Sequence, residues 1–256
     1  MREVRAKKHL GQHFLKDTNT ARRIADILSK ESYSGVLEIG PGTGVLTEFL
    51  LEKGYENFRV IELDKESVDF LKNNYRDLEI IEGDFLKYDL GSLPGKKIAV
   101  IGNFPYNISS QILFRVLENR DRVIEVAGML QKEVAERICS GPGSKSFGIL
   151  SVLLQAYYKT EYLFKVPASV FYPVPKVESA VIRLIRSDEA EPDCDEKLFF
   201  RVVKTVFNQR RKMIRNSLKP LVQTDDIDDK LLSMRPEQLE IKDFYSLTRL
   251  VEERIN

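Results

Sequence analysis

The sequence predicts an α/β domain with an open parallel sheet, followed by a small all-helical domain. Over the first part of the chain, short apolar segments alternate with amphipathic helical segments, which is typical of a parallel sheet with helices on both faces. Residues 186–197 are acidic, contain a proline and include few apolar side chains, which favours a linker. Beyond them only helical periodicity remains. We therefore expect one domain at 1–187 and a helical domain at 188–256.

Each element has its own sequence signal. Asp17 precedes the first amphipathic segment and can cap a helix there. Strands are expected where an apolar run ends in glycine or an acid, and helices where apolar residues return at helical spacing. The expected strands are 35–40, 57–64, 78–84, 97–102, 122–130 and 176–186. The expected helices are 17–30, 44–54, 65–75, 108–119, 145–158, 198–218, 228–234 and 243–255.

Composition excludes several classes of protein. Hydrophobic residues make up 43% of the chain and charged residues 31%, which is ordinary for a globular protein, and no apolar run is long enough to span a bilayer. The N-terminal residues lack the apolar core of a secretory signal. Cys139 and Cys194 have no metal-binding or redox spacing, and both histidines, His9 and His13, are N-terminal. We therefore expect no metal site and a reducing, cytoplasmic location.

Basic residues are concentrated in two segments, although the formal net charge is only +1. Residues 197–220 contain eight Lys or Arg and no acid, and the first sixteen residues contain five basic side chains and one acid. Either segment alone could be a solvated helix face. Together they favour a surface that contacts nucleic acid. The candidates for phosphate contacts are Arg210, Arg211, Lys212 and Arg215.

A glycine-rich loop follows the first strand and opens a helix. Gly40, Gly42 and Gly44 permit a tight turn and a close approach of the backbone to a ligand. A dinucleotide fingerprint would require its third glycine where Val45 stands. Glu38 lies on the strand before the loop, where a carboxylate would repel a pyrophosphate but suits a ligand with an amino group and a sulfonium. The loop therefore favours S-adenosylmethionine as the cofactor.

Acids also end the next two strands. Glu62 can accept hydrogen bonds from both ribose hydroxyls, and the adjacent Leu63 is counted as a cofactor contact, whereas Asp64 can be explained as a helix cap. Asp84 can accept from an adenine amino group while Phe85 packs against the ring. Sites in such sheets gather at the carboxyl ends of the strands. These residues therefore predict a single cofactor site.

The fourth strand ends in the stiff corner Asn103-Phe104-Pro105-Tyr106. Pro105 fixes its own backbone and restricts Phe104. A strand-to-helix turn would explain the asparagine but not the second aromatic ring. In a functional interpretation, the Asn103 carboxamide oxygen and a neighbouring backbone carbonyl accept from an adenine amino group. They direct its lone pair toward a methyl sulfonium, while Tyr106 stacks on the base.

Several stretches resemble a known family. The sequence NFPYNIS closely resembles the Asn-(Leu/Ile)-Pro-Tyr motif of the rRNA adenine N6-methyltransferases. Between about Leu10 and Leu218, other stretches resemble the dimethyltransferase branch of that family, the KsgA type. These stretches are GQHFLKD, LEIGPGTGVLT, VIELD, EGD, MLQKEVAERI, SVFYPVPKVESAVIRL and FNQRRKMIRNSL.

The resemblance implies further site residues. Phe171 would sandwich the target base opposite Tyr106. Two positions depart from the family pattern, because Phe104 replaces the usual Leu or Ile and His13 replaces the usual Asn. The first change affects the shape of the pocket but not the backbone carbonyl, and we expect no catalytic role for the second. The cofactor would be covered by Gln12, His13, Phe14 and Leu15.

The resemblance also implies an activity. The leading hypothesis is dimethylation of N6 on two adjacent adenosines in the 3′-terminal hairpin of 16S rRNA, within a small-subunit particle, by a cytoplasmic protein that we expect to be a monomer. One alternative is a 23S rRNA methylase of the macrolide-resistance type, against which FNQRRKMIRNSL argues. Another is a non-enzymatic assembly factor, which would not need Asn103, Tyr106 and Phe171. A nicotinamide oxidoreductase is disfavoured by Glu38 and by the spacing of the glycines.

Overall fold

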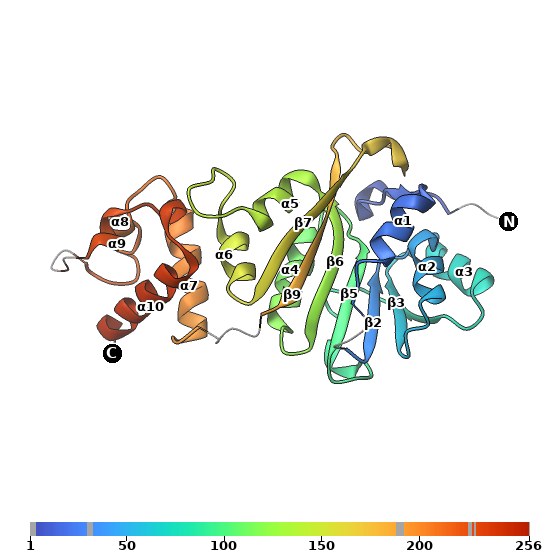
Figure 1. The fold of residues 1–256 in the computed structure, drawn as a ribbon, viewed down its shortest axis with the longest axis horizontal. Helices are drawn as coiled ribbons and strands as arrows, with labels where there is room; N and C mark the ends of the chain where they lie inside the picture. The colour runs from blue at the N-terminus through green and yellow to red at the C-terminus, as the bar shows by residue number, and fades with distance from the viewer. Residues whose placement is uncertain (1–3, 30–32, 188–191, 225–226, 228, 256) are drawn as a thin grey trace. The chain divides into compact units, whose positions relative to one another are not determined.

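The computed structural model describes residues 4–29, 33–187, 192–224, 227 and 229–255. Within these ranges the chain forms two compact units (Figure 1). The first unit comprises 1–135 and 160–186, and the second comprises 136–159 and 187–256. The first unit contains the sheet, and the second is mainly helical.

The first unit is built on a seven-stranded sheet with the order β4-β3-β2-β5-β6-β9-β7. The strands β4, β3, β2, β5 and β6 are parallel, and β9 runs antiparallel to β6. The strands are β2 (Gly35–Ile39), β3 (Phe58–Glu62), β4 (Glu79–Glu82), β5 (Ile98–Asn103), β6 (Val123–Gln131), β7 (Tyr158–Val166) and β9 (Ser179–Arg186). A separate ladder pairs β1 (Phe14–Leu15) with β8 (Phe171–Tyr172).

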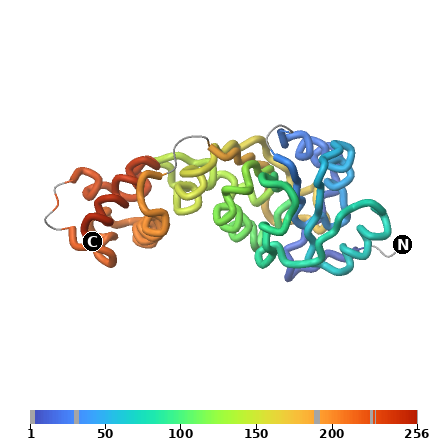
Figure 2. The backbone as a smooth tube through the Cα atoms, turned by 90° about the horizontal axis from the view of Figure 1, so that it is seen from below, coloured from blue at the N-terminus to red at the C-terminus, as the bar shows by residue number. Residues whose placement is uncertain are grey.

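Helices connect the parallel strands and cover both faces of the sheet. Asp17 caps α1 by accepting from the Thr20 backbone N–H at 2.8 Å, as its place in the sequence predicts. Seen along the strands, α1 and α4 lie on opposite sides of the sheet (Figure 2). The helices are η1 (Lys8–Leu10), α1 (Thr18–Ala25), α2 (Val45–Glu52), α3 (Lys65–Asn74), η2 (Leu90–Ser92), α4 (Ser109–Glu118), α5 (Lys132–Cys139) and η3 (Ala168–Val170).

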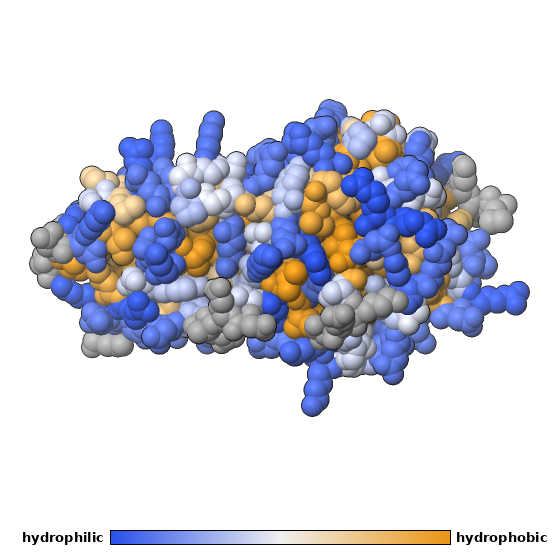
Figure 3. Space-filling view, in the orientation of Figure 1, coloured by the Kyte–Doolittle hydropathy of each residue, from blue (hydrophilic) through white to orange (hydrophobic). Residues whose placement is uncertain are grey.

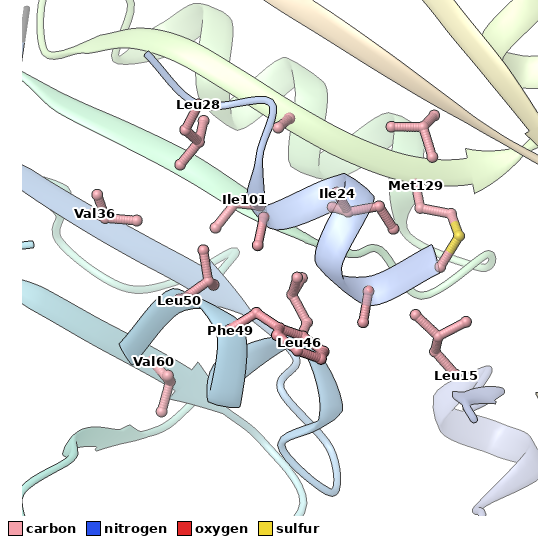
Figure 4. Close-up of a cluster of buried hydrophobic side chains, with 14 of the residues drawn as sticks. Leu15, Ile24, Leu28, Val36, Leu46, Phe49, Leu50, Val60, Ile101 and Met129 are labelled. Atoms are coloured by element: carbon pink, nitrogen blue, oxygen red, sulfur yellow. The ribbon is translucent and has the colours of Figure 1, made fainter. Parts of the chain in front are cut away.

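The helices α1 and α2 pack on one face of the sheet through a hydrophobic cluster. Ile24 and Leu50 have no exposed surface and pack with side chains of three strands, Val60, Ile101 and Met129 (Figure 4). Each fully buried side chain of this size contributes about 1.5–3 kcal/mol of hydrophobic stabilisation. This core therefore holds the strand ends in fixed positions.

The parallel register brings the ends of several strands to one edge of the sheet. Ile39 of β2 lies opposite Ile61 of β3, which lies opposite Ile81 of β4. On the other side of β2, Asn103 ends β5 and lies opposite Met129 of β6. Ligands bind such sheets at the carboxyl ends of the strands, where the chain order switches direction. The loops that carry the predicted site residues therefore converge at this edge.

The second unit is organised around α7 (Glu196–Asn208). Phe207 of α7 stacks on Phe244, with ring centroids 5.8 Å apart. The segment 136–159 belongs to the same unit, and its Phe147 packs edge-on against Phe207 at 6.1 Å. The other helices are α6 (Ile149–Gln155), α8 (Ile214–Ser217), α9 (Lys230–Ser233), η4 (Pro236–Gln238) and α10 (Ile241–Ile255). No helix in the described ranges combines the length and apolar composition needed to cross a membrane.

The packing divides the chain differently from the expected boundary at residue 187. Residues 136–159 precede that boundary but pack with the helical unit, because their apolar side chains cover α7. The sequence pattern predicts no strand at β7, and the expected helix 145–158 extends over the first residue of that strand. As an edge strand, β7 carries Lys and Glu between its apolar residues, which weakens the alternation on which the prediction depends.

The expected helix 198–218 is interrupted. Gln209 leaves the helical conformation at φ −119° and ψ 39°, and Lys212 N–H donates to the Gln209 carbonyl at 2.8 Å. The chain becomes helical again only at Ile214. The predicted phosphate-binding residues Arg210, Arg211 and Lys212 therefore lie in a turn rather than on a helix.

Candidate active site

A pocket opens at the carboxyl edge of the sheet, beneath residues 4–15, which we call the N-terminal arm. Eight residues that line the pocket were not among the predicted site residues, although each lies close in sequence to a predicted one. These eight residues are Leu10, Gly11, Ile39, Ile61, Gly83, Leu86, Asn107 and Ile108. Their only sequence signal is that they are close neighbours of predicted site residues. The predicted residues that line the pocket are Gln12, His13, Phe14, Gly40, Gly42, Glu62, Leu63, Asp84, Phe85, Asn103, Phe104, Pro105 and Tyr106.

The glycine loop has a backbone that favours glycine. Gly40, Gly42 and Gly44 have positive φ angles of 65°, 58° and 82°. A Cβ atom on Gly42 would lie 2.9 Å from the Phe14 ring, and one on Gly44 would lie 2.7 Å from Tyr75. The loop can therefore approach a ligand closely beneath the arm. Gly44 is the N-cap residue before α2, and it lies against Tyr75 rather than lining the pocket.

Glu62 connects the end of β3 to the glycine loop. It is 6% exposed, and its carboxylate accepts from the backbone N–H groups of Gly42 at 3.1 Å and Asp64 at 2.8 Å. Burial raises the pKa of Glu62, while these backbone donors oppose the rise. A carboxylate offers about four acceptor sites. Glu62 therefore holds the loop and retains the capacity to accept from ribose hydroxyls.

Glu38 lies in a small cavity that shares Phe14 and Asn103 with the pocket. It is 1% exposed and accepts from the Thr47 hydroxyl at 2.7 Å. Burial raises the pKa of Glu38 to about 8, against the opposing effect of Thr47, and the nearby Glu62 adds to the rise. Without a cationic ligand, burial therefore favours the protonated form of Glu38, whereas the prediction from sequence was a carboxylate. A bound cation would favour its charged form.

Asp84, Phe85 and Leu63 form a surface suited to a flat, polar-edged ring. Phe85 is buried and Leu63 is 53% exposed, and both line the pocket. Asp84 accepts from the backbone N–H of Leu86 at 2.9 Å and keeps further acceptor sites. These three residues can therefore enclose a purine and accept from its amino group.

Side-chain contacts fasten the N-terminal arm over the pocket. Gln12 accepts from the Lys7 backbone N–H at 2.7 Å and donates to Asp64 at 3.2 Å. Lys7 forms an ion pair with the same carboxylate and lies 3.2 Å from Glu66. Burial alone would raise the pKa of Asp64, but Lys7 and Gln12 hold it below its ordinary value. Asp64 also caps α3, which confirms the alternative given for it.

The arm orients the side chain of Asn103. Its Nδ2 donates to the backbone carbonyl of His13 at 2.8 Å. Because this bond uses the amino side of the amide, Oδ1 is directed to accept from another group. The carbonyl of Pro105 accepts from the Ile108 N–H at 3.1 Å. The Pro105 carbonyl is therefore engaged, and we assign the Phe104 carbonyl as the second group that accepts a hydrogen bond from the adenine amine.

The two rings of the corner have different environments. Phe104 is fully buried, and its ring covers Gly128, where a Cβ atom would lie 2.4 Å away. Gly128 therefore makes room for phenylalanine in place of a smaller aliphatic residue. The Tyr106 ring is partly exposed in the pocket and lies 5.3 Å from the His13 ring. Its hydroxyl bonds to Ser179, and burial raises the pKa of Tyr106.

Leu15 and Phe171 are predicted site residues that do not line the pocket. They lie opposite each other in the β1–β8 ladder and belong to the hydrophobic core, with 5% and 0% exposure. The Phe171 ring therefore has no exposed face on which a base could stack in this structure. Its assignment as the second stacking ring stays a prediction, which requires the ring to leave the core when a base enters. The exposed ring of this segment is Tyr172, at 63%.

Two of the four predicted phosphate-binding residues have partners within the second unit. The guanidinium of Arg210 donates to the Ser144 carbonyl at 3.2 Å and lies 3.9 Å from Glu237. That of Arg215 donates to carbonyls in the segment 224–227, at 2.6 and 2.8 Å. Both side chains therefore hold loops of the unit in place.

Arg211 and Lys212 differ from these two residues. Both are exposed in the turn between α7 and α8, next to Met213, which is 46% exposed. We call residues 209–213 the basic turn. Its exposed cations are better placed than Arg210 and Arg215 to contact a phosphate backbone.

The fold and the pocket define the class of protein. A parallel sheet carries a glycine loop, acids after successive strands and an Asn-Phe-Pro-Tyr corner that open into one pocket. This is the arrangement of an S-adenosylmethionine-dependent methyltransferase whose acceptor is an amine.

Residues 3–253 match the model of the family described as ribosomal RNA adenine dimethylase, and the chain belongs to that family. It is 57% identical to the ribosomal RNA small subunit methyltransferase A of Flavobacterium johnsoniae, over 98% of each chain. The protein of the same name from Parabacteroides distasonis is also 57% identical, over 100% of this chain and 97% of the relative.

Solved structures agree with this assignment. A dimethyladenosine transferase from Plasmodium falciparum is similar with a TM-score of 0.74 and 25% identity, covering 94% of this chain and 97% of that chain. The 23S rRNA methyltransferase ErmE is similar with a TM-score of 0.65 and 27% identity, covering 92% of this chain and 99% of that chain.

Proposed function

We propose that this protein uses S-adenosylmethionine to dimethylate N6 of two adjacent adenosines in the 3′-terminal hairpin of 16S rRNA in the small ribosomal subunit. The observation that carries the proposal is the orientation of Asn103, whose amide nitrogen is engaged by the His13 carbonyl and whose oxygen is thereby assigned to an amine donor. An exocyclic adenine amine is such a donor.

The pocket residues fit the cofactor. The close approach of Gly42 to the arm suits the amino acid portion of the cofactor, and the buried Glu62 suits its ribose. The surface at Asp84 and Phe85 suits its adenine. A cationic amino acid portion would also favour the charged form of Glu38, which burial otherwise disfavours. When bound, the cofactor supplies an electrophilic methyl group on a sulfonium.

The Asn103 corner acts on the acceptor. Before the first transfer, the Asn103 Oδ1 and the Phe104 carbonyl accept the two N6 hydrogens, which draws the nitrogen lone pair out of conjugation with the ring. Before the second transfer, one N–H remains for these two acceptors. Tyr106 supplies a face on which an extruded base stacks. The N6 lone pair would take the methyl group from the cofactor, which would leave as a neutral thioether, and the resulting ammonium would lose its proton to water. Most of the rate enhancement therefore comes from positioning and electrostatics.

The choice of RNA rests on the relatives. Proteins named ribosomal RNA small subunit methyltransferase A are 57% identical to this chain, whereas the 23S rRNA methyltransferase ErmE is 27% identical. This difference favours 16S rRNA over 23S rRNA as the substrate. We assign phosphate contacts to Arg211 and Lys212, and we expect the protein to act as a monomer in the cytoplasm.

The test is methyl transfer from labelled S-adenosylmethionine to unmodified small subunits, with 23S rRNA in parallel, followed by nucleoside analysis. We expect N6,N6-dimethyladenosine in the small-subunit sample alone. Label in 23S rRNA instead would assign the protein to the large-subunit branch. Tight binding to small subunits without methyl transfer would favour an assembly factor.

A further inference from the structure

Tyr172 is an exposed aromatic residue for which the fold gives no packing reason. It is 63% exposed and the nearby Val174 is 61% exposed, whereas Phe171 is fully buried. Hydrophobic residues are visible at this edge of the first unit, above the end of β7 (Figure 3). Adjacent exposed apolar side chains beside a functional pocket often mark a binding surface.

The β1–β8 ladder turns Tyr172 toward the pocket side. Phe14 lies opposite Tyr172, and directly opposed residues of an antiparallel pair project from the same face. Phe14 lines the cofactor pocket, and its ring reaches Gly42. Leu15 and Phe171 project from the other face into the core. The exposed ring therefore shares its side of the ladder with the cofactor site.

A continuous set of contacts joins Tyr172 to the Asn103 corner. The carbonyl of the next residue, Pro173, lies 2.7 Å from His13 Nδ1. A carbonyl can only accept, so His13 carries a proton on Nδ1 and donates it. The His13 ring lies 5.3 Å from the Tyr106 ring. The contacts therefore run from the Asn103 corner to the surface through Tyr106, His13, Pro173 and Tyr172.

The surroundings of Tyr172 suit a nucleotide. Lys16 Nζ lies 5.8 Å from the centroid of the Tyr172 ring. An open groove lined by Tyr172 continues to the exposed Arg5 of the arm. Glu66 and Asp69 of α3 also line this groove, and Lys7 pairs with the first of them. A ring beside exposed cations is the combination that binds single-stranded RNA, through stacking and phosphate attraction.

We propose that Tyr172 stacks a base that flanks the target adenosine in the RNA. This inference rests on the proposed function. The target base is assigned to Tyr106, which lines the pocket with Asn103, whereas Tyr172 lines the adjoining groove. With two adjacent adenosines as substrates, one base enters the pocket while its neighbour leaves the RNA stack. Tyr172 provides the neighbour with a replacement surface, which lowers the KM for the RNA particle without acting on the methyl transfer itself.

The experiment compares Tyr172→Ala with Tyr172→Phe in steady-state methylation of unmodified small subunits. We expect Tyr172→Ala to raise the KM for the subunits about tenfold (1.4 kcal/mol) with kcat close to that of the wild type. Tyr172→Phe should keep the wild-type KM because it keeps the ring. Leu51→Ala, at an exposed apolar residue at the end of α2, is the matched control and should change neither constant. The affinity for S-adenosylmethionine should be unchanged in all three variants.

Three results would overturn the inference. A wild-type KM in Tyr172→Ala would show that the ring contacts no base. An equal rise in KM for Tyr172→Phe would assign the effect to the hydroxyl group instead of stacking. If the wild-type protein neither bound nor methylated small subunits, the proposed function would fail, and this inference would fail with it. The two failures are distinguishable, because the first two results leave the wild-type activity intact.

Discussion

The pocket of the first unit and the basic turn of the second unit use polar side chains in different ways. In the pocket, each key group is fixed by a partner far away in the sequence, as Asn103 is by His13 and Glu62 by Gly42. In the turn, adjacent cations differ in role, since Arg210 is paired within the unit and Arg211 is exposed. The pocket therefore depends on the orientation of single atoms, and the turn depends on how many charges remain exposed.

The largest effect should follow from Asn103→Ala. Loss of a positioned acceptor typically lowers kcat by about 10²–10³-fold, and we expect at least this loss in single-turnover methyl transfer. The affinity for S-adenosylmethionine should change little, because we assign the amide to the acceptor base and not to the cofactor. Asn119→Ala is the control, since it removes an amide at the end of α4 that does not line the pocket. An equal collapse of cofactor affinity in Asn103→Ala would contradict the assigned role.

Gly42→Ala tests the pocket backbone. Its φ of 58° and the 2.9 Å approach to Phe14 make a side chain unfavourable, and we expect cofactor affinity to fall by about tenfold or more, from a cost of about 1–2 kcal/mol. Gly54→Ala is a close control, because Gly54 also has a positive φ, of 65°, but nothing lies within 4 Å of its added Cβ. Isothermal titration with S-adenosylmethionine should show weaker binding only for Gly42→Ala. Equal affinities of both variants would mean that the approach to Phe14 is unimportant.

Substitutions of the basic residues in the second unit should affect either RNA binding or stability, depending on whether the residue is exposed or paired. Replacing both Arg211 and Lys212 by Ala should weaken binding to small subunits and reduce the slope of log K against log salt by about two, since two counterion-releasing contacts are lost. Arg215→Ala should instead lower the unfolding temperature, because its carbonyl partners in the segment 224–227 lose a charged donor. An unchanged salt slope in the double variant would show that the exposed cations do not contact RNA.

The last test concerns Glu38 and the pH dependence of folding stability, not methyl transfer. Its pKa is about 8 in the folded protein and near the ordinary 4.5 when unfolded, so the folded state binds the additional proton between these values. The contribution of Glu38 to the free energy of unfolding is therefore largest at low pH and is lost as the pH rises toward 8. Glu38→Gln should remove this loss, so that its unfolding temperature relative to the wild type increases from pH 5 to pH 8. A constant difference across this range would contradict the raised pKa.

Much of the pocket could be predicted because its signals are local. A glycine or an acid directly after an apolar run is visible in sequence, and a parallel sheet then brings such loops to one edge. The Asn103–Tyr106 corner was predicted for the same reason. The protonation of Glu38 could not be, since it depends on burial by residues from several elements.

Other outcomes depend on contacts between distant segments. Phe171 and Tyr172 are adjacent aromatic residues, and only the pairing with β1 decides which ring is buried. The roles of Arg210 and Arg215 depend on carbonyls of other loops, which a count of charges does not include. The packing of residues 136–159 with the helical unit likewise follows from apolar contacts with α7.

The most direct test of the pocket account is a crystal structure with a bisubstrate analogue that links adenosine N6 to the methyl-donor portion of the cofactor. We predict that the linked nitrogen lies within about 3.2 Å of Asn103 Oδ1 or the Phe104 carbonyl, with Asn103 Nδ2 still donating to the His13 carbonyl. A nitrogen directed away from both oxygens, or an amide reversed toward the arm, would contradict the account.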